Sequence, residues 1–212
     1  MRFIVISDVH RRDSVALWTR ELFEQHHADG VIVLGDITHF GPGDWGEEFL
    51  RSLPGKVYAV PGNCDPPLAH EALARGAESI HARRIVIEGR DVVGFGGSNI
   101  THLDTPNEMQ EGRIFEELSK IMTGGCIMAL HCPPYGINDL TFMKMRGGST
   151  AIGKLVETFK PVLVLSGHIH EARGIVEKDG TTFMNPGAAK DGFSGLVDIG
   201  ERIEVRLLDR RS

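Results

Sequence analysis

The residues with the clearest chemistry in this sequence follow five short apolar runs. They are Asp8, His10, Asp36, Asn63, His131, His168 and His170. Neutral imidazoles combined with carboxylate and amide oxygens suit first-row divalent ions, and the lack of a cysteine quartet argues against a structural zinc site. Seven ligands are too many for one ion with an open position and fit two ions that share a carboxylate. Two ions about 3.5–4 Å apart stabilise both oxygens of an in-line displacement at phosphorus, so the set predicts phosphoester hydrolysis.

The apolar runs themselves predict strands that carry these side chains to one place. The runs cover residues 3–6, 31–34, 57–60, 126–130 and 162–165. Apolar runs without alternation are typical of strands that are buried on both faces, with helices covering the sheet. Ligand sites in such sheets form beyond the carboxyl ends of the strands. We therefore expect all seven polar side chains to line one crevice.

Each motif has an ordinary structural explanation when it is taken alone. Asp8 fits a turn residue and His10 a surface residue, and Gly-Asp at 35–36 is common turn chemistry. Gly-His-Ile-His at 167–170 is more specific, because a spacing of two in extended backbone puts both rings on one side. The five motifs together, in this order, favour a metal site.

The other histidines and one cysteine lack this context. We expect the histidines in turns or at the surface, with His39 as the exception because its loop, 37–46, borders the crevice. Cys132 adjoins His131 but points the other way in a strand, so we expect it in the core. The histidines concerned are His26, His27, His39, His70, His81 and His102.

Between the runs, the sequence predicts helices and a second set of strands. Helices are expected over residues 14–27, 45–53, 68–75, 108–122 and 149–159, with Ser14 and Ser149 as capping residues. A hairpin over 84–88 and 91–95 begins a second sheet, which short strands near 174–177, 181–185, 196–199 and 203–207 extend. We predict a four-layer αββα sandwich of two mixed β-sheets flanked by helices, in a single domain over 1–212.

One long irregular segment interrupts this pattern. Residues 133–148 contain prolines, glycines and two methionines that look exposed, and loops of this length in compact domains are usually lids or mobile segments. We expect the segment to move over the crevice.

Composition narrows the class of protein. The net charge of −6 disfavours a nucleic-acid partner, although a local basic patch stays open. Three cysteines, Cys64, Cys126 and Cys132, form no disulfide framework and favour a reducing compartment. No apolar run approaches a membrane span. The expectation is a cytoplasmic protein without a membrane partner that acts on a small molecule; homo-oligomerisation is left open.

The ordered motifs resemble those of the calcineurin-like metallophosphoesterase superfamily. Those motifs are Asp8-x-His10, Gly35-Asp36, Gly62-Asn63-Cys64-Asp65, His131 and Gly167-His168-Ile169-His170. Smaller details at 133–136, 170–174 and 185–187 resemble small prokaryotic phosphodiesterase-like members. The resemblance implies that Asp8, His10 and His170 hold one ion, that Asn63, His131 and His168 hold the other, and that Asp36 bridges them. A hydroxide between the ions would then attack phosphorus. Mn is the expected metal, with Fe, Ni, Co and Zn as alternatives.

The sequence departs from the family pattern at Cys64. The family commonly has Gly-Asn-His there, and that histidine assists the leaving group or the phosphate oxygens. A cysteine resembles the branch that acts on phosphodiesters. Beyond the metals, Cys64, Asn99, Lys144 and Arg146 are predicted to contact substrate, against the alternative that the last three are solvated loop residues.

The leading prediction is a dinuclear-metal-dependent phosphodiesterase. The enzymatic alternatives are a phosphomonoesterase or phosphoprotein phosphatase, and a nuclease, which the acidic balance disfavours. A scaffold that uses the same fold without catalysis is the alternative from another class, and the complete ligand set argues against it.

Overall fold

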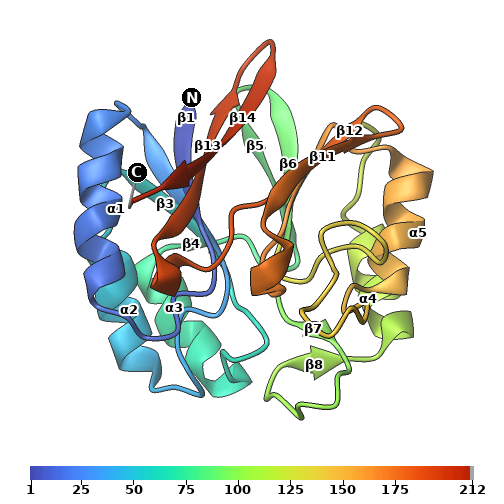
Figure 1. The fold of residues 1–212 in the computed structure, drawn as a ribbon, viewed down its shortest axis with the longest axis horizontal. Helices are drawn as coiled ribbons and strands as arrows, with labels where there is room; N and C mark the ends of the chain where they lie inside the picture. The colour runs from blue at the N-terminus through green and yellow to red at the C-terminus, as the bar shows by residue number, and fades with distance from the viewer. Residues whose placement is uncertain (211–212) are drawn as a thin grey trace.

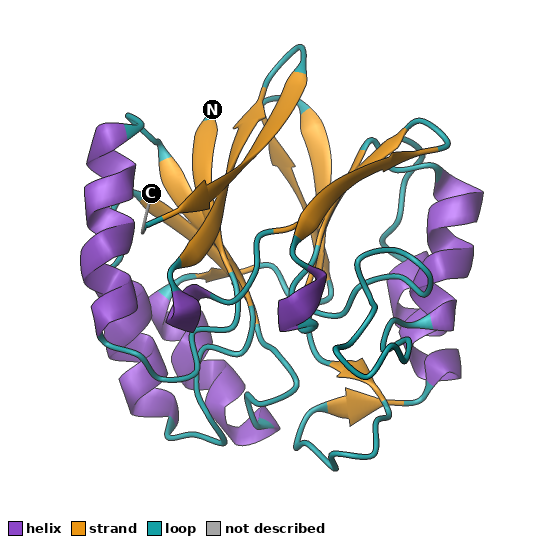
Figure 2. Cartoon of the chain, in the orientation of Figure 1, coloured by secondary structure: helices purple, strands orange, loops and turns teal. Residues whose placement is uncertain are grey.

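Two six-stranded β-sheets lie face to face in the computed structural model, which describes residues 1–210. Helices cover the outer face of each sheet, and a small two-stranded ribbon lies near the ends of the strands (Figures 1 and 2). This arrangement confirms the predicted αββα sandwich.

The first sheet holds the strands that lead into three of the predicted motifs. It runs in the order β14-β13-β1-β2-β3-β4, with β1, β2, β3 and β4 mutually parallel and β13 antiparallel to both β1 and β14. Its strands are β1 (Arg2–Ile6), β2 (Gly30–Leu34), β3 (Lys56–Val60), β4 (Glu78–Ser79), β13 (Phe193–Ile199) and β14 (Ile203–Asp209).

The second sheet carries the two remaining motifs. Its order is β11-β12-β10-β9-β6-β5, with β6, β9, β10 and β12 parallel and hairpins at both edges. Its strands are β5 (Arg83–Ile87), β6 (Arg90–Phe95), β9 (Ile127–Leu130), β10 (Leu163–Leu165), β11 (Gly174–Lys178) and β12 (Thr181–Asn185). The separate ribbon pairs β7 (Ser98–Asn99) with β8 (Glu108–Met109).

The helices divide between the two outer faces (Figure 1). The first sheet is covered by α1 (Ser14–Gln25), α2 (Gly43–Ser52) and α3 (His70–Gly76), and the second by α4 (Glu111–Ser119) and α5 (Thr150–Phe159). Short 3-10 turns cover Pro67–Ala69, His170–Ala172 and Ala189–Asp191. The longest helix in residues 1–210 has 12 residues, and no helix there has the length and apolar character needed to cross a bilayer.

Both faces of the central strands are buried, which explains why the apolar runs do not alternate with polar residues. On β1, Ile4 and Ile6 pack towards Trp18 of α1, while Phe3 and Val5 belong to the core between the sheets. Three layers of apolar contact result, one between the sheets and one under each set of helices. The strands that carry the motifs are therefore held by burial on both faces.

Two local expectations were wrong. Asp13, not Ser14, occupies the N-cap position of α1, and its carboxylate accepts a hydrogen bond from the Trp45 indole at 3.0 Å instead of capping the helix. The helix expected from residue 108 begins at Glu111, because residues 108–109 pair with 98–99 in the ribbon. The capping role of Ser149 is confirmed: its hydroxyl accepts from the Ile152 amide at 3.2 Å.

Candidate active site

A crevice of about 660 Å³ opens where the carboxyl ends of the two sets of parallel strands meet. All five ligand-bearing strands end at this edge, β1, β2 and β3 in the first sheet and β9 and β10 in the second. Its lining residues are His10, Arg11, Arg12, Asp36, His39, Phe40, Asn63, Cys64, Leu103, Thr105, His168, His170 and Lys190.

One cluster of candidate ligands joins the loop after β1 to the loop after β10. Asp8 is fully buried, and its Oδ1 lies 3.2 Å from His170 Nε2. His170 Nε2 in turn lies 3.3 Å from His10 Nε2. The three side chains offer ligand atoms that all lie within 4.8 Å of one another. Two imidazole nitrogens and a carboxylate oxygen at these distances can supply part of the coordination shell of a divalent ion.

A second cluster joins β3 to β9, and its hydrogen bonds show which lone pairs face the crevice. His131 Nδ1 lies 2.7 Å from the Leu34 carbonyl, which only accepts, so Nδ1 carries the proton and Nε2 presents a lone pair. Asn63 Nδ2 donates to Thr105 Oγ1 at 2.9 Å, and the Thr105 hydroxyl donates to Glu108 at 2.6 Å. Asn63 Oδ1 therefore faces His131 Nε2, only 2.7 Å away. Two acceptors point at each other, an arrangement that a bound cation would relieve.

Asp36 lies between these two clusters. Its Oδ1 is 3.4 Å from His131 Nε2, and its Oδ2 is 3.6 Å from His10 Nε2. The Cys64 amide donates to Oδ1 at 2.8 Å, which fixes the carboxylate in this orientation. One oxygen faces each cluster, as a bridging ligand requires. Asp8 is also shared, since it lies within ligand distance of His10 and His170 and of Asp36 and His131.

His168 is the seventh candidate ligand and adjoins the second cluster. Its ring centroid lies 5.1 Å from that of His131, with the planes at 63°, and it lines the crevice. The His168 amide donates to Asp8 Oδ2 at 3.1 Å, so the same loop also orients the first cluster. The structure thus brings all seven predicted ligands to one edge of the two sheets.

The backbone is strained where these ligands sit. Asp8, His10, Asp36 and His168 adopt left-handed φ angles of 58°, 44°, 49° and 67°, which non-glycine residues rarely take. Such strain collects at functional sites, where the surrounding structure holds it. Only glycine fits at Gly62 and Gly167, because a Cβ there would meet the Asp36 carboxylate or the Ser7 hydroxyl. No periodic sequence signal predicts these conformations.

Asp65 holds two of the ligand loops together, a role the sequence did not reveal. It is fully buried and accepts from the amides of Ile37 at 3.0 Å, Thr38 at 2.6 Å and Gly62 at 2.7 Å. The loop after β2 is thereby joined to the loop after β3. Its place two residues after Asn63 was the available signal, since an Asp in such a turn often binds backbone amides.

Burial sets the protonation states that metal binding needs. It lowers the pKa of His10 and of His168 to about 3, so both rings are neutral ligands. Burial opposes the charge on Asp8, but the hydrogen bond from His170 holds its pKa below the ordinary value. Burial, together with the nearby charge of Asp8, raises the pKa of Asp36 to about 6. A cation beside Asp36 would favour its charged form.

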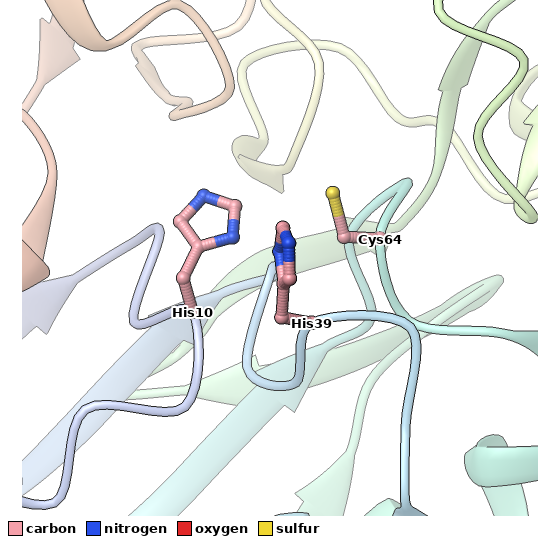
Figure 3. A group of neighbouring side chains, drawn as sticks. All are labelled: His10, His39 and Cys64. Atoms are coloured by element: carbon pink, nitrogen blue, oxygen red, sulfur yellow. The ribbon is translucent and has the colours of Figure 1, made fainter.

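Cys64 and His39 meet His10 on the open side of the site. Figure 3 shows the three side chains rising from three separate loops towards the same space. Their ligand atoms lie within 4.8 Å of one another, and the rings of His10 and His39 are 5.5 Å apart. Burial and the Asp36 carboxylate raise the pKa of the Cys64 thiol above its ordinary value. His39 is exposed and lines the crevice, as expected from its loop.

The other predicted substrate contacts lie elsewhere. Asn99 accepts from the buried Cys132 thiol at 3.1 Å, and Arg146 pairs with Asp139 at 2.5 Å. Lys144 is in an exposed turn. None of these three lines the crevice, whereas Arg11, Arg12 and Lys190, which the sequence did not single out, do. Cys132 is 2% exposed, as expected for a core thiol.

The segment 133–148 is fixed at its base and exposed at its tip. Tyr135 N donates to Ser149 O at 2.9 Å, Gly147 N to Asp139 O at 2.9 Å, and Asn138 Nδ2 to Ala172 O at 3.0 Å. Phe142 and Met143 are 78% and 62% exposed. The expectation that the whole segment has little to pack against was wrong, since only its tip, residues 142–146, is exposed throughout. Movement of the segment over the crevice stays a prediction.

Two divalent ions fit the donor set. The residues present include neutral imidazoles, two buried carboxylates and an amide oxygen, with two acceptors left facing each other at His131 and Asn63. His10 Nδ1 is also buried without a hydrogen-bond partner in residues 1–210. Nothing in the donor set selects one first-row ion over another.

Comparison with known proteins places the chain in a family. The model of the calcineurin-like phosphoesterase family matches residues 1–172, and the chain belongs to that family. An uncharacterised protein of Methanocaldococcus jannaschii is 35% identical in an alignment of 196 positions that covers 88% of this chain and 88% of its own. As a family member with candidate ligands for two ions, the protein is a metallophosphoesterase.

Two solved structures share the fold across the whole chain. A dimetal phosphatase from Danio rerio has a TM-score of 0.67 at 13% identity, covering 99% of this chain and 96% of its own. A structure described as a novel archaeal phosphodiesterase has a TM-score of 0.59 at 18% identity, covering 99% of both chains. At these identities the likeness concerns the fold alone.

Proposed function

We propose that this metallophosphoesterase is a dinuclear-metal phosphodiesterase. The observation that supports it best is the position of Asp36, with one oxygen towards His10 and the other towards His131, beside a thiol at Cys64 where the family pattern has an imidazole. The two ions, when bound, neutralise phosphoryl oxygens and lower the pKa of water. A diester has one negative charge to neutralise and depends less on an added imidazolium than a dianionic monoester does.

The chain's own residues would do the rest of the work. Asp8, His10 and His170 would hold one ion, Asn63, His131 and His168 the other, and Asp36 both. The Leu34 carbonyl keeps the His131 proton on Nδ1, and Thr105 keeps the Asn63 oxygen turned inwards. These contacts orient the ligands before substrate arrives, which reduces the reorganisation that binding and reaction require.

His39 favours phosphomonoesterase activity as a second candidate. It is an exposed imidazole whose ring lies 5.5 Å from that of His10 and beside Cys64, so it can reach a phosphate bound between them. A protonated imidazole there could supply the positive charge and the proton that Cys64 lacks. If the protein is a diesterase, His39 does not replace the imidazole that the family pattern has at position 64.

Comparison of bis(p-nitrophenyl) phosphate with p-nitrophenyl phosphate tests the proposal. The protein is loaded with Mn²⁺, its metal content is measured, and kcat/KM is determined for both compounds with the wild type and with His39→Ala. A diesterase turns over the diester faster, and His39→Ala retains that ratio. Faster turnover of the monoester, lost in His39→Ala, would overturn the diesterase assignment in favour of the second candidate.

The proposal also covers the metal ion, the type of substrate and the cellular compartment. We propose Mn²⁺ as the ion in use and a small-molecule phosphoester as substrate. The cysteines at 64, 126 and 132 are all free and buried, which suits the reducing cytosol as the place of action.

A further inference from the structure

One rim of the crevice carries three cations without carboxylate partners. Arg11, Arg12 and Lys190 all line the crevice and all are exposed. Within residues 1–210 none of the three forms an ion pair or a side-chain hydrogen bond. The carboxylate of the same turn, Asp13, is engaged with the Trp45 indole. The positive charge at this rim is therefore available to a ligand.

The backbone fixes these cations beside the first ligand cluster. His10 N donates to Asp36 O at 2.8 Å and Arg11 N to Ile37 O at 3.1 Å, and Arg11 has a left-handed φ of 61°. On the other side of the same loop, Ala189 N donates to Ser7 O at 2.7 Å and Lys190 N to Asp8 O at 3.3 Å. The cations thus project from loops that are tied to the ligand loops, and their placement belongs to the crevice itself.

Two other lining residues of the crevice are exposed and apolar. Phe40 is 55% exposed and Leu103 is 76% exposed, and the Phe40 amide donates to the Cys64 carbonyl at 3.0 Å. Exposed apolar groups in a cleft favour an aromatic or hydrophobic group of a ligand. The crevice therefore offers different chemistry to the two substituents of a diester.

Charge balance indicates that a simple diester leaves the crevice positive. If two divalent ions bind as proposed, the carboxylates of Asp8 and Asp36 offset half of their charge, and a diester adds one negative charge. The three cations at the rim then still form no ion pair with a carboxylate of residues 1–210, although the whole chain has a net charge of −6. A positive crevice in an acidic protein concentrates field lines on an anionic ligand.

We propose that the crevice takes a phosphodiester of about nucleotide size that carries a second phosphate on the arm lying against Arg11, Arg12 and Lys190. The inference rests on the proposed function, and it names the substrate class. The other arm, aromatic or apolar, lies against Phe40 and Leu103. The crevice volume of about 660 Å³ suits a small molecule of this size rather than a polymer.

A matched pair of substrates tests the second phosphate. They are the p-nitrophenyl ester of thymidine 5′-phosphate and the same compound with a 3′-phosphate. We expect kcat/KM to be roughly tenfold higher for the 3′-phosphorylated compound at low salt, because the rim charges attract it. The difference in kcat/KM between the two compounds should shrink at roughly 0.5 M salt, because dissolved ions then screen charges that are more than a few ångströms apart. Equal values for both compounds at low salt would overturn the inference and leave the diesterase intact; no turnover of either, with both ions bound, would overturn the proposed function itself.

Charge-removing variants show whether the named rim is responsible. The variant Arg11→Gln/Arg12→Gln/Lys190→Gln should lose the preference, mainly through a higher KM for the 3′-phosphorylated compound. The control Arg113→Gln/Lys120→Gln removes two exposed charges in and directly after α4 that do not line the crevice, and it should retain the preference. Bound metal and circular dichroism establish that each variant is folded. A folded triple variant with an unchanged preference would overturn the assignment to these residues.

Two further measurements test the inference even if the triple variant does not fold. With wild-type protein, thymidine 3′,5′-bisphosphate should inhibit about tenfold more strongly than thymidine 5′-phosphate; equal inhibition would contradict a second phosphate subsite. A ten-residue thymidylate strand should be cleaved more slowly per bond than the doubly phosphorylated mononucleotide. Faster cleavage of the strand would overturn the small-molecule assignment.

Discussion

The two sheets contribute different chemistry to the site. The loops after β1, β2 and β3 of the first sheet supply Asp8, His10, Asp36 and Asn63, so three of its four ligand candidates are oxygen donors. The loops after β9 and β10 of the second sheet supply His131, His168 and His170, which are all imidazoles. Each cluster contains members from both sheets. Neither sheet alone can complete either cluster, so the site depends on the packing of one sheet on the other.

The core between the sheets sets the distance across that junction. Leu34 of β2, Ala129 of β9 and Leu165 of β10 are all buried in this layer, at or next to the strand ends that lead into the ligand loops. Protein interiors are closely packed, so a small displacement of one strand is passed on to its neighbours. Apolar contacts without a chemical role of their own therefore fix the oxygen ligands of the first sheet relative to the imidazole ligands of the second.

Removal of the carboxylate between the halves should have the largest effect. Asp36→Ala is expected to reduce kcat/KM by roughly 10³-fold or more, because both clusters lose a ligand and the acids and bases of a site act as a unit. Bound metal, measured after dialysis, should fall towards zero for both ions. His170→Ala is the comparison, since it should weaken mainly one ion. Two tightly bound ions and normal turnover in Asp36→Ala would refute the bridging assignment.

Weakening only the oxygen-rich half should have the next largest effect. Thr105→Val removes the acceptor that holds the Asn63 amide, and loss of such supporting contacts typically lowers metal affinity by about 10–100-fold. Titration of the metal-free protein with Mn²⁺ should show one weakened site of two. Thr101→Val is the matched control, because Thr101 donates to the same Glu108 at 2.6 Å without contacting Asn63. Equal loss in both variants would assign the effect to the loop and not to Asn63.

A histidine at position 64 should shift the preference of the crevice from diesters towards monoesters. Cys64→His places an imidazole beside Asp36, where it can offset the second charge of a monoester. We expect the ratio of monoesterase to diesterase kcat/KM to rise by roughly threefold to tenfold, since an engineered group lacks its supporting contacts. Both ratios are measured at equal metal occupancy. An unchanged ratio with both ions bound would show that position 64 does not set the preference.

His81 offers a smaller test, in a small cavity that Val60 and Pro61 at the end of β3 also line. Burial lowers its pKa to about 4 from 6.5, and its Nδ1 accepts from the Gly96 amide at 2.9 Å. The unfolded chain therefore binds the proton more readily, and the free energy of unfolding should fall as the pH drops from 6.5 towards 4. Over that range we expect about 3 kcal/mol from this group.

His81→Gln provides the comparison, since glutamine can accept the same hydrogen bond without titrating. Urea unfolding of both proteins at pH 7 and near pH 4.5 should show the variant losing less stability on acidification. Parallel losses in the two proteins would mean that His81 keeps an ordinary pKa in the folded state.

The ligands and strands could be predicted from the sequence because their signals are local. An apolar run of four or five residues followed by Asp or His is visible in one stretch, and burial on both faces of a strand follows from it. The supports of the site are not local. Thr105 contacts Asn63 across 42 positions, and Lys190 reaches the Asp8 loop from the far end of the chain. Such contacts arise only when loops without periodicity meet, and the ribbon of β7 and β8 was missed for the same reason.

The pairing of β1 with β13 has a consequence for biosynthesis. The amino group of Met1 donates to the Ile199 carbonyl, and the Asp8 loop receives two amide hydrogen bonds from residues 189–190. During translation β1 leaves the ribosome long before β13, its neighbour on one side. Until β13 is made, that edge of β1 is unpaired and apolar, the kind of transiently exposed surface that chaperones recognise. The Asp8 loop receives its two amide hydrogen bonds only after residues 189–190 have been synthesised.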